Sequence, residues 1–256
     1  MSLSLSNLRR EFDWLLKRWL RWSAPVVRKS VGSVAPLLAE LSAGERARYD
    51  ALAEAYDISG FGDVCTRTLF YQCMNRLDLL DQHVAPTPPG GLDVGALNWT
   101  YLPALAAFKP GCWDGYELDG YQRYISMDTR GAQGRHMAAA VAGATYHVGS
   151  ILDVRGQWGL VTWFLPYVTP GPLVSAGLPD RFYDPATMLT HVWSLVAPGG
   201  ALFVMNVDAD EDHFQARLFA DAGIPATRLG LISSVFDDEE DENHGWVAVK
   251  PTDGSS

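Results

Sequence analysis

Cysteine is scarce in this sequence. The 256 residues include three cysteines, Cys65, Cys73 and Cys112, with no Cys-x-x-Cys pair and no histidine at ligand spacing beside them. An odd and sparse set of this kind argues against a disulfide framework and against a zinc site, and it favours a reducing cytoplasm. We therefore predict a cytoplasmic protein without a bound metal.

Long apolar runs are also missing. No stretch reaches the roughly 18 apolar residues that a membrane-spanning helix needs, and no N-terminal segment reads as a secretion signal. The sequence thus predicts a soluble protein. Hydrophobic residues make up 48% of the chain, which is ample for a large core in one large or two small domains.

Positive charge is scarce outside the N-terminal segment. The formal net charge is −10, but residues 1–30 hold seven basic residues against Glu11 and Asp13, a local charge of +5 that leaves −15 for the rest. An acidic body repels phosphate backbones. We expect no nucleic-acid partner unless the basic segment makes the contact.

Helical periodicity runs through the first third of the chain. Apolar residues recur at helical spacing over 8–20, with arginine and lysine on the other face, which predicts an amphipathic helix. Further helices are predicted at 34–41, 43–56 and 63–80. The Pro-rich stretch 86–90 ends this region, because proline neither extends a helix nor pairs inside a sheet. We divide the chain into a helical region, 1–85, and a second domain, 86–256.

In the second domain, short apolar runs alternate with stretches of helical length, a pattern typical of a parallel sheet covered by helices. Seven strands are predicted, at 91–95, 113–117, 144–148, 159–164, 201–206, 227–233 and 246–250. Helices are predicted at 100–108, 120–140, 185–196 and 210–222. The last two strands are separated mainly by the acidic turn 237–242, too short for a crossover helix, so we expect an antiparallel hairpin there.

The first two strands carry a nucleoside-binding pattern. Residues 91–95 form an apolar run that ends in Asp93, Val94 and Gly95, and a helix-length interval separates them from Glu117. Glycine lets a ligand approach its backbone, and a carboxylate accepts a hydrogen bond from each hydroxyl of a ribose. Leu97 and Trp99 stand where a dinucleotide-binding loop has its further glycines, so a pyrophosphate fits poorly.

These residues, in this order, resemble the class I S-adenosylmethionine-dependent methyltransferases. Residues 91–95 resemble the first motif of that family, residues 115–119 the second, residues 146–151 the third, and residues 196–200 the Pro-Gly-Gly turn before the fifth strand. The resemblance implies a Rossmann-like α/β fold, with a seven-stranded, mostly parallel sheet and a C-terminal antiparallel hairpin. It also implies S-adenosylmethionine as cofactor, a ligand that carries no phosphate.

The resemblance assigns cofactor contacts residue by residue. Gly95 and the Ala96 backbone are expected at the amino-acid part of the cofactor, Glu117 at the ribose and Leu118 beside the adenine. The full set of expected cofactor-binding residues is Asp93, Gly95, Ala96, Leu97, Glu117, Leu118, Ser150, Ile151, Trp163 and Phe164. Glu117 has two structural alternatives, as a cap of the next helix or as the ion-pair partner of Arg123.

The end of the fourth strand is expected to face the methyl acceptor. Residues 164–167 half resemble an Asn-Pro-Pro-Tyr motif, but Phe164 stands where an amine acceptor would need a hydrogen-bonding oxygen. We predict Pro166 and Tyr167 as a wall for an aromatic or apolar small molecule, with a protein acceptor less favoured. The sequence indicates no general base. The Pro-rich stretch 169–179 is predicted to be a stiff loop over the site.

Several alternatives stay open. The chain would be a methyltransferase, a binding or scaffold protein of the same fold without activity, or a nicotinamide-dependent oxidoreductase, which the missing glycines disfavour. The N-terminal helix would be a lid, a homodimerisation arm, or an interfacial membrane contact through Trp14, Trp19 and Trp22. We favour the lid, because caps are common in front of this kind of domain.

Overall fold

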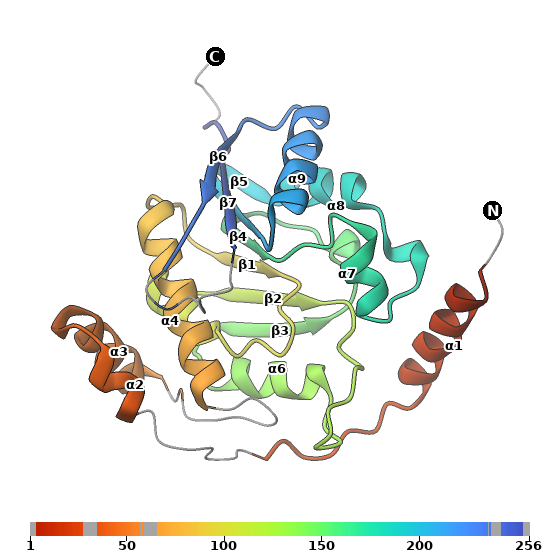
Figure 1. The fold of residues 1–256 in the computed structure, drawn as a ribbon, viewed down its shortest axis with the longest axis horizontal. Coiled ribbons are helices and arrows are strands. Elements are labelled where there is room, and N and C mark those ends of the chain that lie inside the picture. The colour runs from red at the N-terminus through yellow and green to blue at the C-terminus, as the bar shows by residue number, and fades with distance from the viewer. Residues whose placement is uncertain are drawn as a thin grey trace.

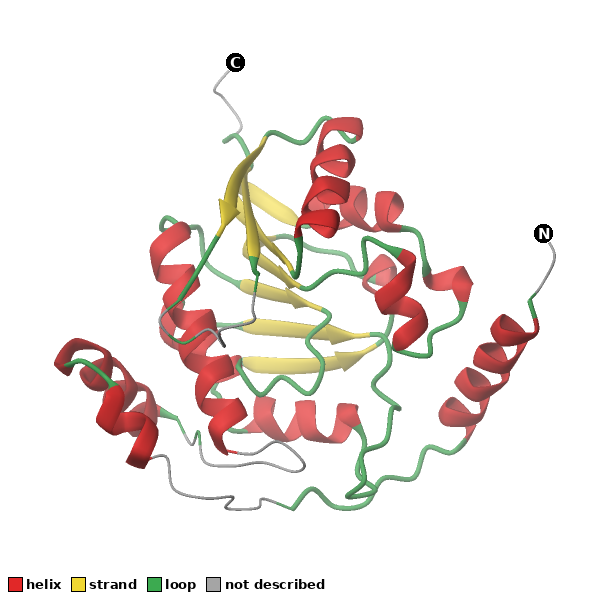
Figure 2. Ribbon diagram, in the orientation of Figure 1, coloured by secondary structure: helices red, strands yellow, loops and turns green. Residues whose placement is uncertain are grey.

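A seven-stranded sheet forms the centre of the molecule in a computed structural model that describes residues 4–27, 35–56, 58, 66–234, 236 and 242–252 (Figures 1 and 2). The strands are β1 (Gly91–Val94), β2 (Trp113–Glu117), β3 (Ala144–Val148), β4 (Trp158–Phe164), β5 (Val196–Asn206), β6 (Ala226–Leu231) and β7 (His244–Val249). All seven predicted strands are therefore present, although β5 begins five residues earlier than the sequence indicated.

The sheet has the order β3-β2-β1-β4-β5-β7-β6. Strands β1 to β5 pair in parallel, β7 is antiparallel to β5, and β6 is antiparallel to β7. The predicted mostly parallel sheet and C-terminal hairpin are confirmed. The connections reverse direction between β1 and β4, and open α/β sheets bind ligands beyond the carboxyl ends of the strands at such a point.

Helices cover both faces of this sheet. The described helices are α1 (Leu5–Trp19), α2 (Ala35–Glu40), α3 (Ala43–Ala55), α4 (Thr66–His83), α5 (Leu102–Phe108), α6 (Arg130–Ala139), α7 (Pro170–Ser175), α8 (Pro185–Ser194) and α9 (Ala209–Asp221), with 3-10 turns η1 (Ile151–Asp153) and η2 (Asp180–Phe182). Residues of α4, α5 and α6 pack in one apolar cluster, and residues of α8 and α9 pack in a second. Side chains of β4 alternate between the two clusters, as expected for a strand buried on both faces.

Two predicted segments differ from the structure. The helix expected over 120–140 begins only at Arg130, where the Thr129 hydroxyl accepts a hydrogen bond from the Ala132 N–H. Residues before it form turns, and Arg123 and Thr129 pair in an isolated bridge. The loop expected over 169–179 contains α7, because Pro170 suits the first turn of a helix, where its missing N–H costs nothing.

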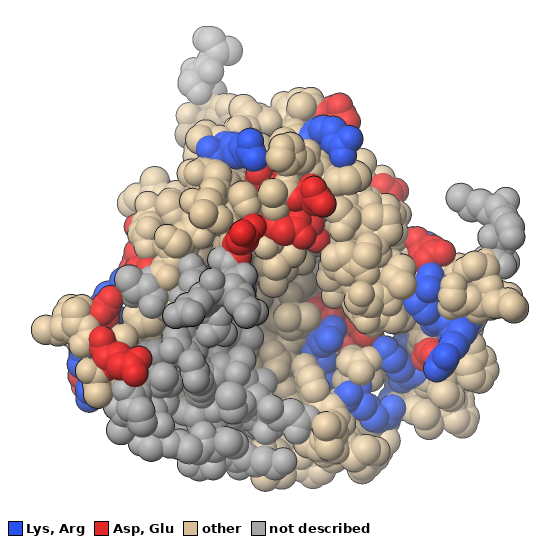
Figure 3. Space-filling model, in the orientation of Figure 1, with Lys and Arg blue, Asp and Glu red and all other residues tan. Residues whose placement is uncertain are grey.

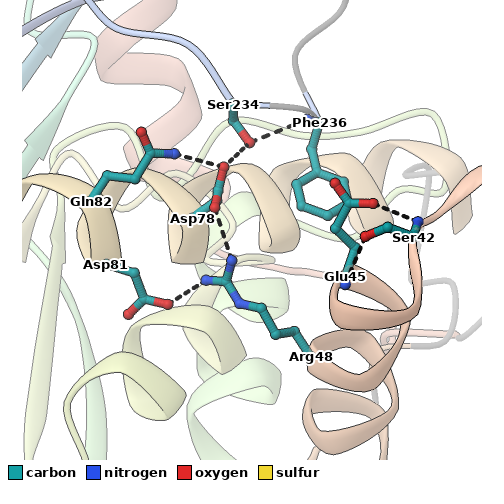
Figure 4. Close-up of polar contacts among 8 residues, drawn as sticks. All are labelled: Ser42, Glu45, Arg48, Asp78, Asp81, Gln82, Ser234 and Phe236. Carbon is teal, nitrogen blue, oxygen red and sulfur yellow. Dashed lines mark hydrogen bonds and ion pairs between the residues drawn. The ribbon is translucent and has the colours of Figure 1, made fainter.

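The N-terminal helices do not form one compact unit. Helix α1 lies on one side of the molecule, whereas α2 and α3 lie on the other, and α4 packs against α5 (Figure 1). A capping box between Ser42 and Glu45 starts α3. The buried Asp78 of α4 accepts hydrogen bonds from Arg48 of α3 at 2.9 Å and from Ser234 at 2.7 Å, and so joins α3 and α4 to the segment after β6 (Figure 4).

Some predictions fall on residues outside the described ranges. These are Cys65, the starts of the helices expected at 34–41 and 63–80, and positions 237–241 of the acidic turn. In the part of the chain that the structure describes, no helix is long and apolar enough to cross a membrane. The same residues contain no cluster of three or more histidine, cysteine or acidic side chains able to hold a metal ion.

Candidate functional site

A cavity of about 320 Å³ lies beyond the carboxyl ends of β1, β2 and β4. Its polar half is formed where β1, β2 and β3 end, by Gly95, Leu97, Glu117, Gly149 and Ser150. Its apolar half lies around the end of β4, α7 and η2, and is formed by Phe164, Pro166, Tyr167, Leu173, Leu178 and Phe182. This is the position at which an open α/β sheet holds its ligand.

The loop after β1 has a left-handed backbone at two positions that are not glycine. Leu97 and Trp99 have positive φ angles of 49° and 57°, in the left-handed region that costs most residues about 1–2 kcal/mol. Two contacts hold this turn: the Leu97 N–H donates to the Glu117 carboxylate at 3.0 Å, and the Tyr146 hydroxyl donates to the Leu97 carbonyl. Trp99 fits because Gly115 has no side chain, since a Cβ there would lie 2.7 Å from the indole.

Glu117 is the most constrained carboxylate of the polar half. Its Oε1 accepts hydrogen bonds from the Asp119 N–H at 2.7 Å and from Arg130 at 3.1 Å, and its Oε2 accepts from the Leu97 N–H. The partner is therefore Arg130, while Arg123 donates to the backbone carbonyls of Leu20 and Trp22. A carboxylate offers about four acceptor positions, so one position on Oε2 stays available for a hydroxyl.

Arg130 neutralises the buried Glu117. Burial lowers the pKa of Arg130, but Coulombic attraction to Glu117 and hydrogen bonding to Tyr124 outweigh it, and the net direction is upward. Nearby, burial raises the pKa of Asp119, and its ion pair with Lys17 of α1 at 3.2 Å opposes that rise. The polar half thus rests on a charge network that reaches α1.

Asp93 and Ala96 lie beneath the cavity and are not among its lining residues. Asp93 accepts hydrogen bonds from Thr162 at 2.7 Å and Tyr101 at 2.9 Å, and burial raises its pKa to about 7. The Ala96 N–H already donates to the Tyr116 carbonyl at 3.0 Å. Tyr101, whose hydroxyl donates to Asp93, does line the cavity. Asp93 is therefore connected to the cavity only indirectly, through Tyr101. Direct contacts of Asp93 and Ala96 with a cofactor stay predictions.

The other residues expected at a cofactor all line the cavity. Gly95, Leu97, Glu117, Leu118, Ser150, Ile151, Trp163 and Phe164 are brought together there, with Pro166 and Tyr167. The Ser150 hydroxyl accepts a hydrogen bond from the Leu152 N–H at 3.2 Å and so caps η1. Phe164 contacts the rings of Tyr101 and Phe203 edge-on, which makes it a packed wall of the apolar half.

The polar half fits a phosphate-free adenosine ligand. Gly95 and Gly149 both line the cavity, and a Cβ on either would meet no atom within 4 Å, so a ligand has open access to their backbone. Glu117 offers a carboxylate oxygen to a ribose hydroxyl. The N–H groups of Gly95, Ala96 and Leu97 are all engaged within the protein, so this loop offers no nest of free N–H donors to a pyrophosphate.

Comparison with known proteins agrees with this geometry. The sequence matches no protein-family model, and no curated protein matches it significantly. A SAM-dependent methyltransferase from Aquifex aeolicus aligns over 70% of this chain and 90% of its own, with a TM-score of 0.53 and 11% sequence identity. The fold is that of the class I methyltransferases. Magnesium protoporphyrin IX methyltransferase from Synechocystis with bound SAM aligns over 97% of this chain and 98% of its own, with a TM-score of 0.45 and 14% identity.

Three residues of this cavity in the methyltransferase fold were not predicted from the sequence. Arg76 of α4 stacks on Phe164 at 4.5 Å, Tyr101 holds Asp93, and Arg181 of η2 pairs with Glu11 of α1. Arg76 and Arg181 come from segments outside the family motifs, and no spacing rule connects them to β1. Tyr101 follows the first motif closely, so its position at the start of α5 was a usable signal.

Proposed function

We propose that this protein transfers a methyl group from S-adenosylmethionine to a small apolar or aromatic acceptor. The observation that carries the proposal is the cavity itself: a methyltransferase-fold sheet ends in a polar half with Glu117 and two open glycines, next to an apolar half. An enzyme of this kind would need a donor site next to an acceptor site, and a cavity with adjoining polar and apolar halves supports that proposal.

Glu117 has the task of orienting the nucleoside end of the cofactor. Its Oε2 has one acceptor position left, suited to one ribose hydroxyl, and the ion pair with Arg130 holds the carboxylate in place. Leu118 and Ile151 supply apolar surface for the base. When bound, the cofactor supplies an electrophilic methyl group on a sulfonium. The protein then has to align the acceptor with that group and to exclude water.

The apolar half indicates the class of acceptor. Phe164, Tyr167 and Phe182 line it with aromatic surface, and Leu173 and Leu178 complete it. Residue 164 offers no side-chain oxygen to hold an amine, because it is phenylalanine. A planar aromatic hydroxyl compound or a similar small molecule suits these walls, and a protein side chain is the less favoured acceptor.

Calorimetric titration tests whether the protein binds the proposed cofactor. S-adenosylmethionine and S-adenosylhomocysteine should both bind, whereas NADH should produce no heat, because the N–H groups of Gly95, Ala96 and Leu97 are already engaged and offer a pyrophosphate no donor. A Leu231→Ser variant, altered at an exposed position of β6, is the matched control and should bind like the parent. Absence of binding at millimolar ligand, or preferential binding of NADH, would overturn the proposal.

A binding protein that transfers no methyl group is the second candidate. Among the described residues that line the cavity, none is a histidine, cysteine or lysine. Its two carboxylates both have structural roles, because Glu117 pairs with Arg130 and Asp184 accepts a hydrogen bond from the Thr187 N–H at the start of α8. A screen of radiolabelled methyl transfer to a broad panel of phenols, carboxylates and amines separates the two functions. Cofactor binding without transfer to any member of the panel would favour the second.

A further inference from the structure

Helix α1 is docked on the body by its polar side. Arg10 pairs with Asp180, Lys17 pairs with Asp119, and the buried Asn7 accepts a hydrogen bond from the Asp180 N–H at 3.0 Å. Trp14 on the same side is 3% exposed, lies 4.7 Å from the Phe182 ring, and packs with Leu173 and Leu178. These contacts fix the rotation of the helix about its axis.

The opposite side of α1 is apolar and faces solvent. Leu5 is 86% exposed, Phe12 65% and Trp19 80%, and these residues recur at the seven-residue spacing that keeps them on one helical face. Leu8, Leu15 and Leu16 are exposed on the same face. A surface helix of a globular protein usually buries its apolar face. In α1 the apolar face is exposed, and the polar face contacts the rest of the protein.

The exposed apolar surface continues beyond the end of α1. Trp22 is 63% exposed, and the residues after it run beside the turn before α6, because Ala24 donates to the Met127 carbonyl at 3.1 Å. That turn presents Ile125, which is 96% exposed, and Met127. We call the whole surface the apolar stripe, formed by Leu5, Leu8, Phe12, Leu15, Leu16, Trp19, Trp22, Ile125 and Met127.

Basic residues accompany the apolar stripe. Arg9 and Arg21 are exposed on or just after α1, whereas Arg18 stacks on Trp14 at the docked side, and Figure 3 shows several lysine and arginine side chains around this helix. Residues 1–30 carry a formal charge of +5 and the rest of the chain −15, so the N-terminal segment has the opposite sign from the remainder. A surface that joins aromatic and leucine side chains to arginines is complementary to an anionic lipid interface.

We propose that the apolar stripe docks on the surface of a lipid bilayer that contains anionic lipids. Phe12, Trp19 and Trp22 enter the boundary between headgroups and acyl chains, where tryptophan is favoured, and Arg9 and Arg21 meet the anionic headgroups. A second copy of the chain is a poorer occupant, because it would bring an equally basic surface against this one.

Vesicle co-sedimentation of the full chain tests this proposal. The protein should sediment with vesicles of phosphatidylcholine and phosphatidylglycerol in equal parts, less with phosphatidylcholine alone, and less at high salt. The double variant Phe12→Ser/Trp19→Ser should lower the partition coefficient about tenfold or more, because two large apolar groups no longer enter the bilayer. Both positions are exposed, so an unchanged circular dichroism melt shows that the variant is folded.

Leu231→Ser is the matched control, because Leu231 is 65% exposed on β6, away from the apolar stripe, and its variant should bind vesicles like the parent. Failure of the parent to sediment with the mixed vesicles would overturn the proposal, as would equal losses in the control and the double variant. A parent dimer in sedimentation velocity that the double variant converts to monomer would assign the apolar stripe to a second copy instead.

Discussion

The two halves of the cavity are built in different ways. The polar half is formed at strand ends and is held by hydrogen bonds to the backbone, as with the Leu97 N–H and the Asp119 N–H on Glu117. The apolar half is formed by the end of β4, α7 and η2, and its contacts are side chains packed on side chains. Rigid strand ends suit a constant ligand, whereas loops and short helices suit a variable one.

This difference separates what can be proposed about the donor from what can be proposed about the acceptor. A single carboxylate with three hydrogen-bond partners leaves little freedom for what binds beside it. A wall of aromatic rings accepts any flat molecule of suitable size. Changes in the polar half should therefore act on cofactor affinity and stability together, and changes in the apolar half should leave cofactor affinity nearly intact.

The largest effect is expected for Glu117→Ala. It leaves the buried Arg130 without its carboxylate, so we expect a loss of about 3–5 kcal/mol in the free energy of unfolding, and at least about a tenfold loss of S-adenosylhomocysteine affinity. Urea unfolding and calorimetry measure the two effects. The double variant Glu117→Gln/Arg130→Met should regain part of the stability, because it leaves no unpaired buried charge. It should not regain the affinity, because the carboxylate that would bind the ribose is still missing.

Asp93→Asn should change the pH dependence of stability. Burial raises the pKa of Asp93 to about 7, above its unfolded value near 4, so the folded state holds a proton that the unfolded state has lost in this window. The parent should therefore lose stability as pH rises from 5 to 7, by at most about 1.4 kcal/mol per pH unit from this group, and the loss should level off above pH 7.

Thermal or urea unfolding of parent and Asp93→Asn between pH 5 and pH 8 isolates this contribution, since the other titrating groups are common to both proteins. The stability difference should move in favour of the variant as pH rises. A difference that is constant across this range would show that Asp93 is ionised throughout and that its hydrogen bonds with Thr162 and Tyr101 outweigh burial.

Tyr167→Ala tests the apolar half. Tyr167 is half-buried beside Trp14, Leu173 and Leu178, so we expect a loss of about 1–2 kcal/mol of stability from lost packing. S-adenosylhomocysteine affinity should stay within about threefold of the parent, since one contact at the far half is lost. Calorimetry gives the answer, and a loss as large as that of Glu117→Ala would erase the distinction between the halves.

The smallest effect is expected for Leu97→Gly. Glycine relieves the left-handed backbone at φ 49°, worth about 1–2 kcal/mol, but its greater freedom in the unfolded chain costs about 0.5–1 kcal/mol, so the net change should be a gain of about 0–1.5 kcal/mol. Unfolding in urea measures it. A strong loss of stability would mean that the Leu97 side chain, which is 40% exposed, supports the polar half directly.

Much of the fold was predictable from the sequence, because most strands, such as β1, β4 and β5, are short and largely apolar segments between breaks and can be recognised without a distant partner. The prediction of a helix over 120–140 was wrong in its first half, because contacts between distant segments determine the structure there. A Cβ on Gly120 would lie 2.4 Å from a Val148 methyl group, so the segment after β2 is packed tightly on β3 before the helix can begin. The exposure of the apolar face of α1 was equally hidden, since periodicity indicates a face but not what it meets.

The site residues also fall into two groups, those that a sequence motif can locate and those that depend on packing between distant segments. Gly95, Glu117 and Ser150 sit at strand ends that a motif can locate, and the structure brings them to one cavity. The ion pair of Glu117 with Arg130, in place of Arg123, depends on where α6 begins. Arg76 and Arg181 reach the cavity from α4 and η2 through packing between distant segments, which no local pattern encodes.

The most direct test is the electron density of S-adenosylhomocysteine in a crystal of the protein. We expect the ribose within hydrogen-bond distance of Glu117, the base beside Leu118 and Ile151, and the sulfur directed toward the apolar half at Phe164 and Tyr167. Density for the nucleoside in the apolar half, or for the ligand outside this cavity, would contradict it.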